Sequence, residues 1–216
     1  MAPTSRGNLP VSPDPFHLSA DADECLQHWL VAVVATPGLT ALRDFDEARR
    51  ALLEDSLRGV EVVRGFDGTI VDVGSGGGAP GIPLAAALPD RDVTLLEAEE
   101  RKAEFLRSWE QRLTNLRVVR GRAEEQETDV YGVAVAKALA QPPVATEWCL
   151  PLVRAGGAVV LWVGPTVDLE HVARVSARLA GGEPENRDGL LVIPKLGPTP
   201  EGFPRRPGMA RKRPLP

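Results

Sequence analysis

Hydrophobic residues recur at two different spacings, and the change of spacing divides the chain into two parts. In the first part, apolar residues return every three or four positions, as on one face of an α-helix. These positions are Leu26, Trp29, Leu30 and Val33. Ser19 is a suitable N-cap, and the helix is expected to end before Pro37. A second helical pattern covers residues 44–57.

From residue 69 onward, short runs rich in β-branched residues alternate with helical runs. This alternation is typical of a parallel sheet with helices on both faces. The expected strands are residues 70–73, 92–96, 116–119, 132–136, 158–163 and 190–193. The expected helices are residues 82–88, 99–113, 143–153 and 169–179. The pattern predicts a doubly wound α/β fold.

Four segments follow from these patterns. Residues 1–18, which hold four prolines, are expected to form a flexible arm, and residues 19–60 a helical cap. Residues 61–197 are expected to form the α/β domain, and residues 198–216 a basic, proline-rich C-terminal tail. A length of 216 residues favours one main domain with extensions.

Composition is that of an ordinary globular protein, with 43% hydrophobic and 25% charged residues. No stretch approaches the ~18 apolar residues of a membrane span, and the N-terminus lacks the apolar core of a signal peptide. A cytoplasmic protein without a membrane partner is expected. Cys25 and Cys149 have no neighbouring Cys or His at metal-ligand spacing, so both are expected to be buried thiols rather than metal ligands.

Charge is unevenly distributed along the chain. The formal net charge is −5, yet residues 195–216 contain six basic residues and one acid, Glu201. The basic residues are Lys195, Arg205, Arg206, Arg211, Lys212 and Arg213. The five from Arg205 onward are candidates to pair with RNA phosphates. Alternatively, Phe203 and Leu215 dock the tail on the domain, which is compatible with an RNA contact, or the tail is simply a solvated terminus.

The segment VDVGSGGGAPGIP, residues 71–83, lies between a predicted strand and a predicted helix. In a doubly wound sheet this loop lies at the ligand site, outside the carboxyl ends of the strands. Its glycines allow the backbone to approach a ligand closely and to adopt conformations closed to other residues. They are Gly74, Gly76, Gly78 and Gly81. The loop therefore predicts a nucleotide-cofactor site.

Two cofactors compete for this loop. Residues 76–81 fit the G-x-G-x-x-G pattern of dinucleotide binding, and residues 72–78 fit an acid-x-G-x-G-x-G pattern typical of S-adenosylmethionine binding. Asp72 would repel a pyrophosphate and suits a cationic methionine moiety. Pro80 and Pro83 lack the amide N–H groups that a helix N-terminus offers to phosphate. S-adenosylmethionine is favoured, and a nicotinamide-dependent oxidoreductase remains the alternative.

Several segments resemble one known family. They are the loop VDVGSGGGAPGIPLA, then VTLLEAEERKAEFL, RAEE at 122–125, the tail PTPEGFPRRPGMARKRPL, and GLTALRD and LLEDSL near the N-terminus. Over roughly residues 25–215 the chain is similar to the bacterial small-subunit rRNA guanine-N7 methyltransferase G family, also called glucose-inhibited division protein B.

The resemblance implies a seven-stranded class I, Rossmann-like methyltransferase with an N-terminal helical extension. It implies transfer from S-adenosylmethionine to N7 of one guanine in 16S rRNA, within the small ribosomal subunit or its assembly intermediate. By position, Gly74 and Ala79 would line the cofactor, Glu97 would bind its ribose, and Ala123 and Glu124 would flank its adenine. A monomer is the default expectation.

The chain departs from the family pattern at four positions. The family commonly has asparagine at Gly38, histidine at Leu52 and lysine at Val163, and it usually has arginine at Lys137. Lysine keeps the charge of arginine but lacks its planar fork. A noncatalytic RNA-binding relative is therefore a further alternative.

Guanine N7 carries a lone pair and no proton, so methyl transfer to it needs no general base. Alignment of the reacting atoms and exclusion of water should supply most of the catalysis. Lys137 is the candidate to position the acceptor through a phosphate or O6, at the edge of the cofactor site. The three histidines, His17, His28 and His171, are expected to serve surface or packing roles.

Overall fold

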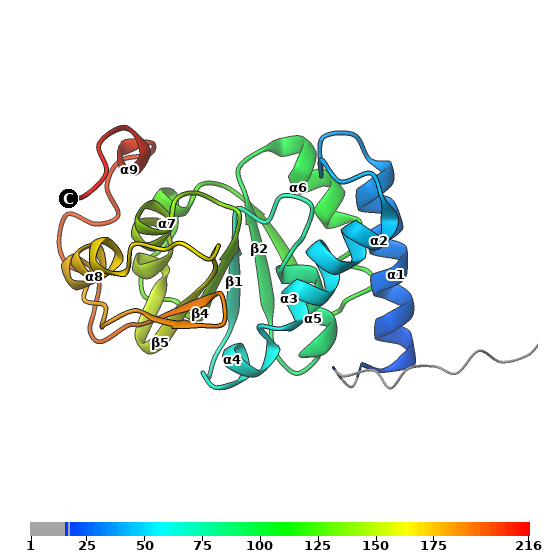
Figure 1. Ribbon diagram of the computed structural model, residues 1–216, viewed down its shortest axis with the longest axis horizontal. Coiled ribbons are helices and arrows are strands. Elements are labelled where there is room, and N and C mark those ends of the chain that lie inside the picture. Colours follow the sequence, from blue (N-terminus) through cyan, green and yellow to red (C-terminus); the bar gives the residue numbers. More distant parts are fainter. Residues whose placement is uncertain (1–15, 17) are drawn as a thin grey trace, which may run out of the picture.

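One sheet of seven strands crosses the part of the chain that the computed structural model describes, which is residue 16 and residues 18–216 (Figure 1). The arm expected at residues 1–18 falls almost entirely outside the described residues. The strands are β1 (Ile70–Val73), β2 (Val93–Glu97), β3 (Leu116–Arg120), β4 (Tyr131–Lys137), β5 (Val153–Trp162), β6 (Glu185–Arg187) and β7 (Leu190–Pro194).

The strand order is β3-β2-β1-β4-β5-β7-β6. β1 to β5 are parallel, whereas β7 pairs antiparallel with both β5 and β6. The order reverses between β1 and β4, which places the ligand crevice at the carboxyl end of β1. The fold typical of dinucleotide-binding proteins has a sixth parallel strand after the first five. The antiparallel β6–β7 hairpin therefore separates this fold from the nicotinamide alternative.

Helices cover both faces of the sheet. They are α1 (Ala20–Ala35), α2 (Phe45–Ala48), α3 (Asp55–Leu57), α4 (Val60–Arg64), α5 (Gly81–Ala87), α6 (Glu100–Arg107), α7 (Pro142–Cys149), α8 (Leu169–Arg178) and α9 (Met209–Lys212). A π-helical stretch (Arg49–Glu54) joins α2 to α3, and short 3₁₀ turns lie at Ala123–Glu125 and Leu150–Leu152. Figure 1 shows α1, α3, α5 and α6 on one side of the sheet and α7 and α8 on the other.

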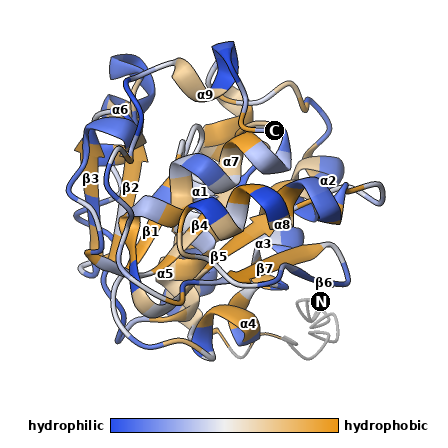
Figure 2. Cartoon of the chain, turned by 90° about the vertical axis from the view of Figure 1, so that its left-hand side faces the viewer, coloured by the Kyte–Doolittle hydropathy of each residue, from blue (hydrophilic) through white to orange (hydrophobic). Residues whose placement is uncertain are grey.

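Two hydrophobic cores result, one on each face of the sheet. All four residues of β1 are buried; Ile70 belongs to one core and Val71 to the other. Figure 2 shows the central strands as largely hydrophobic between the helices, as expected for parallel strands covered on both faces. Trp29 and Leu53, from the N-terminal helices, lie in the same core as Ile70. The N-terminal helices and the sheet are thus packed together.

The expected elements are present, with shifted ends. The helix expected over residues 99–113 ends at Arg107 and continues as turns. The helix expected to reach residue 153 ends earlier, and β5 begins at Val153. That error arises because a short continuous apolar run reads equally well as a helix or a strand. β6 was missed because its three residues are all exposed and carry no hydrophobic signal.

Two further expectations concern the cysteines and the membrane. Cys25 and Cys149 are both free and buried, which confirms the prediction of buried thiols. None of the helices in the described part of the chain is both long and apolar enough to cross a membrane.

Candidate active site

A cavity of about 760 Å³ opens at the carboxyl ends of β1, β2 and β4. Its walls come from the glycine-rich loop, the ends of the strands, the 3₁₀ turn at Ala123–Glu125, α1 and the C-terminal tail. The sequence-predicted residues that line it are Gly74, Gly76, Ala79, Glu97, Ala123, Glu124, Lys137 and Arg211. The fold therefore brings most of the predicted cofactor residues to one cavity.

The loop needs glycine for two separate reasons, which are a positive φ angle and close packing against neighbouring side chains. Gly74 has φ +71°, and a Cβ on it would lie 2.4 Å from Leu139 Cδ1. Gly81 begins α5, and a Cβ there would lie 2.2 Å from Leu95 Cδ2 and 2.7 Å from Asp72 Oδ2. Trp29 Nε1 donates to the Gly77 carbonyl oxygen at 2.9 Å, which ties α1 to the loop.

Asp72 and Gly78 do not line the cavity, which corrects their predicted roles. The Asp72 side chain lies beneath the loop, 1% exposed, and Oδ2 accepts from the Gly81 N–H at 3.0 Å. Its Oδ1 is buried without a hydrogen-bond partner. Asp72 therefore anchors the start of α5 and lies outside the lining of the cavity. Gly78 instead allows close packing on Ile82 and Trp29.

Burial raises the pKa of Asp72 from 3.8 to about 7, although the Gly81 N–H partly opposes this rise. Between these pH values the folded protein retains a proton that the unfolded chain releases. The free energy of unfolding therefore falls as pH rises from about 4 to 7 and stays lower above 7.

Asp72→Asn should remove this pH dependence, since asparagine does not titrate. Relative to the original protein, the variant should gain about 3 kcal/mol of stability between pH 5 and pH 8, because about two pH units of the shift lie above pH 5. Urea unfolding of both proteins at the two pH values checks this. If the difference in stability between the two proteins is the same at pH 5 and pH 8, the raised pKa of Asp72 is contradicted.

Glu97, at the end of β2, is held by two backbone amides. Its Oε2 accepts from Gly76 N and its Oε1 from Glu99 N, both at 2.8 Å. The side chain lines the cavity although the residue is only 7% exposed. A carboxylate has about four lone-pair sites, so two remain for a ligand. This is the arrangement needed to accept hydrogen bonds from a ribose diol.

The C-terminal tail forms one wall of the cavity, which sequence patterns did not indicate. Glu124 Oε1 accepts from the Gly208 N–H at 2.9 Å. The Arg211 guanidinium lies over the Trp148 ring, 5.0 Å from its centroid, and donates to the Leu139 carbonyl oxygen at 3.2 Å. Gly208, Arg211 and Trp148 all line the cavity. Side chains distant in sequence therefore close the site.

Arg205 is committed to the body of the protein, which corrects its assignment as an RNA contact. Its Nε and a terminal nitrogen each lie 2.6 Å from an oxygen of Glu147, a residue only 4% exposed. Leu215 is buried, and its carbonyl oxygen lies 2.8 Å from His171 Nε2. Phe203 packs against the core beneath α7 and α8. The docked-tail alternative is thus what the structure shows.

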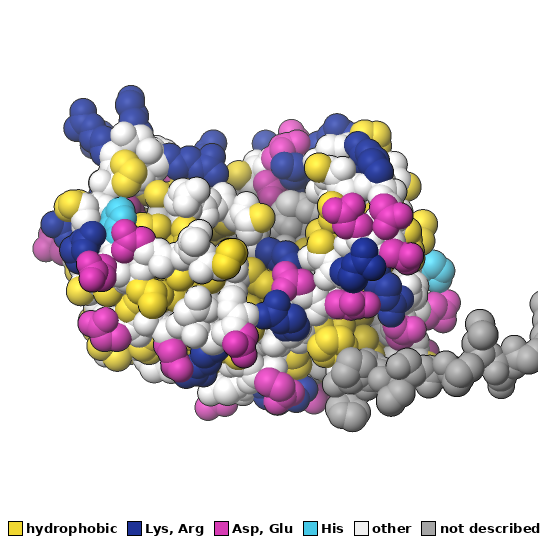
Figure 3. Space-filling model, in the orientation of Figure 1, with side chains coloured by type: hydrophobic (Ala, Val, Ile, Leu, Met, Phe, Trp, Pro, Cys, Tyr) yellow, Lys and Arg dark blue, Asp and Glu magenta, His cyan; other side chains and the backbone are white. Residues whose placement is uncertain are grey.

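Lys195, counted with the basic residues near the C-terminus, is buried rather than exposed. Its Nζ donates to the Leu150 carbonyl oxygen at 3.0 Å and to Thr199 Oγ1 at 2.8 Å, and lies 3.5 Å from Asp129. Burial lowers its pKa. The Arg206, Lys212 and Arg213 side chains remain exposed. Figure 3 shows basic side chains projecting at the upper left, where Figure 1 places α9.

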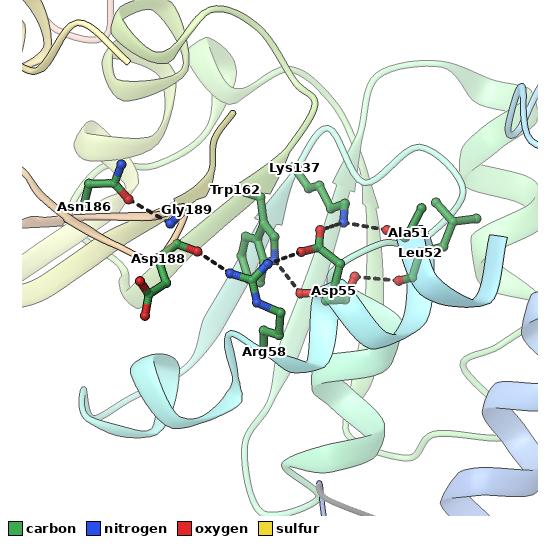
Figure 4. Close-up of polar contacts among 10 residues, drawn as sticks. Ala51, Leu52, Asp55, Arg58, Lys137, Trp162, Asn186, Asp188 and Gly189 are labelled. Atoms are coloured by element: carbon green, nitrogen blue, oxygen red, sulfur yellow. Dashed lines mark hydrogen bonds and ion pairs between the residues drawn. The ribbon is translucent and has the colours of Figure 1, made fainter. Parts of the chain in front are cut away.

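Lys137 lies at the end of β4, between the first cavity and a second one. Its Nζ donates to the Ala51 carbonyl oxygen at 2.6 Å and pairs with the Asp55 carboxylate (Figure 4). The second cavity, of about 410 Å³, shares Lys137, Ala138 and Leu139 with the first. Two adjoining cavities at the end of one strand can hold a group-transfer cofactor and its acceptor substrate side by side.

The other positions that depart from the expected family pattern lie in different places. Leu52 lines the first cavity and Val163 the second, whereas Gly38 lines neither. No histidine is among the described residues that line the two cavities. Among the described residues, no cluster of three or more His, Cys, Asp or Glu could hold a metal ion.

Comparison with known proteins agrees with this geometry. Residues 24–181 match a family model described as rRNA small subunit methyltransferase G. A ribosomal RNA small subunit methyltransferase G from Pelotomaculum thermopropionicum is 39% identical over 197 residues, which cover 82% of each chain. One of the same description from Chloroflexus aggregans is 37% identical over 195 residues, again 82% of each.

A solved structure supports the fold. It is a SAM-dependent O-methyltransferase from Thermotoga maritima, which superposes with a TM-score of 0.54 at 16% identity. The match covers 74% of this chain and 72% of that one.

Proposed function

Because this chain belongs to the rRNA small subunit methyltransferase G family, we propose that it transfers the methyl group of S-adenosylmethionine to N7 of a guanine in 16S rRNA. The observation that supports this most is the pair of adjoining cavities at the carboxyl ends of the strands. The larger cavity suits the cofactor, and the smaller one suits an extruded base.

The residues of the larger cavity fit S-adenosylmethionine. Glu97 offers free lone pairs for the two ribose hydroxyls, and Ala123 with Leu96 offers an apolar surface for adenine. Glu124 lies at the same end of the cavity, where its side chain accepts a hydrogen bond from Gly208 of the tail. The backbone at Gly74 passes close to the cavity without a side chain. The cofactor supplies an electrophilic methyl group on a cationic sulfur.

The transfer needs little acid–base chemistry from the protein. The N7 lone pair forms the new bond to carbon, the carbon–sulfur bond breaks with its electrons passing to sulfur, and positive charge moves to the guanine ring. No proton leaves N7, which agrees with the lack of histidine among the described lining residues. The protein's task is to hold acceptor and methyl group in line and to exclude water.

The exposed cations of the C-terminal tail stand near the cavity wall formed by Gly208 and Arg211. Arg206, Lys212 and Arg213 are free to contact RNA phosphates beside an extruded base. The small ribosomal subunit, or an assembly intermediate, is the proposed partner, and a monomer suffices for this arrangement because both cavities lie within one chain.

A transfer assay tests the proposal. The purified protein is incubated with S-adenosylmethionine tritiated in its methyl group, and with naked 16S rRNA or small subunits from a bacterium lacking its own copy of this enzyme. After digestion to nucleosides, the label should elute as N7-methylguanosine. Label in another nucleoside would contradict the base assignment. No label, with S-adenosylmethionine still bound in calorimetry, would favour a noncatalytic RNA-binding relative.

A further inference from the structure

An ion pair includes Lys137, one of the residues that line both cavities. Lys137, at the end of β4, pairs with Asp55, the first residue of α3, and both residues line the second cavity. The Lys137 side chain is 15% exposed and that of Asp55 31%, so each can still meet a ligand. Figure 4 shows the two side chains pointing toward one another from opposite elements.

Neighbouring groups hold this pair in place. Asp55 Oδ1 accepts from Arg58 at 2.8 Å, and the Asp55 carbonyl oxygen accepts from Trp162 Nε1 at 2.8 Å. Arg58 in turn donates to the Asp188 carbonyl oxygen in the turn between β6 and β7. A Cβ on Gly59 would lie 2.4 Å from the Trp162 ring, so the indole packs directly against the Gly59 backbone. Groups from the sheet, from the N-terminal helices and from the β6–β7 hairpin therefore hold Asp55 in place.

Both members of the pair retain hydrogen-bonding capacity. A lysine ammonium has three donors, and two have partners, Ala51 and Asp55. The Asp55 carboxylate has about four lone-pair sites, and two are used by Lys137 and Arg58. The Lys137 ammonium thus has one free donor and cannot accept a hydrogen bond. The adjacent Asp55 carboxylate has free acceptor sites and cannot donate one.

We propose that the second cavity binds the acceptor guanine and that the Lys137–Asp55 pair selects it over adenine. Guanine carries an acceptor, O6, beside a donor, N1–H; adenine carries a donor, N6–H₂, beside an acceptor, N1. Lys137 donates to O6 and Asp55 accepts from N1–H. With adenine each contact would place donor against donor or acceptor against acceptor. This assignment rests on the proposed function.

The pairing also reduces an electrostatic difficulty. Methyl transfer places positive charge on the guanine ring, which an isolated ammonium at Lys137 would oppose. The Asp55 carboxylate lies between Lys137 and Arg58 and offsets part of their positive charge, so the Lys137 ammonium opposes the reaction less than it would alone.

Single and paired substitutions test the assignment in the transfer assay. Asp55→Asn and Lys137→Gln keep the approximate side-chain shape, and each should lower kcat/KM for 16S rRNA by about 10- to 100-fold. For Asp55→Asn, whose side chain does not line the larger cavity, the affinity for S-adenosylmethionine measured by calorimetry should not change. Glu54→Gln, in the neighbouring exposed pair with Arg49, is the matched control and should retain full activity.

The exchange Asp55→Lys with Lys137→Asp separates recognition from structure. It restores an ion pair but interchanges donor and acceptor, so activity should stay as low as in the single variants. Recovery of activity in the exchanged protein would overturn the proposal, as would full activity in both single variants. A loss explained wholly by weaker S-adenosylmethionine binding would also overturn it. If the unaltered protein produces no N7-methylguanosine, the proposed function itself fails.

Discussion

Replacing Glu97 with alanine is expected to lower the affinity for S-adenosylmethionine by about two to three orders of magnitude. The change removes the carboxylate that orders the loop through Gly76 N and the start of α6 through Glu99 N. It also removes the proposed acceptor for the ribose diol. Hydrogen bonds to a charged group contribute about 1.5–3 kcal/mol each, and 1.4 kcal/mol corresponds to a tenfold change in affinity.

Calorimetric titration of S-adenosylmethionine into the Glu97→Ala protein measures this loss. Glu104→Ala is the matched control, because Glu104 is an exposed glutamate on α6 outside the cavity. The control should bind as the unaltered protein does. A Glu97→Ala protein that binds with nearly unchanged affinity would show that Glu97 only supports the loop.

Replacing Arg205 with methionine should destabilise the protein by about 3–5 kcal/mol, because it leaves the buried Glu147 carboxylate without its partner. Methionine preserves much of the apolar part of the arginine side chain, so most of the destabilisation should come from the lost ion pair. The tail wall of the cavity should loosen with it, since Arg205 also donates to the Arg213 carbonyl oxygen at 2.9 Å. Denaturant unfolding measures the stability.

Arg206→Met provides the comparison, because Arg206 is the adjacent residue and is exposed. Its stability should match that of the unaltered protein. Adding Glu147→Gln to Arg205→Met should recover part of the loss, because an amide costs less to bury than an unpaired carboxylate. Equal unfolding curves for the Arg205→Met and Arg206→Met proteins would contradict the docked tail.

The sheet and the loop could be predicted because their signals are local. β1 is buried on both faces, and three of its four residues, directly ahead of the glycines, are β-branched and apolar. Glu97 could be found from its place at the end of the second strand. The first helix was evident from its apolar face and the Ser19 cap, which accepts from the Ala22 N–H at 3.2 Å.

The walls of the site could not be predicted, because they depend on pairings that no local pattern encodes. Lys137 and Asp55 are 82 residues apart, and Arg205 and Glu147 are 58 apart. The charge of the tail predicts an RNA contact for Arg205, and only its packing against Glu147 shows that Arg205 faces inward. Asp72 was expected to face a ligand, but strand register buries it beneath the loop.

The most direct test of the account is the modification of 16S rRNA in a strain from which this gene has been deleted. Nucleoside mass spectrometry and mapping by reverse transcription should show one N7-methylguanosine missing in the deletion strain and restored by the gene. The Glu97→Ala gene should restore it poorly. An identical set of N7-methylguanosines with and without the gene would contradict the proposed function.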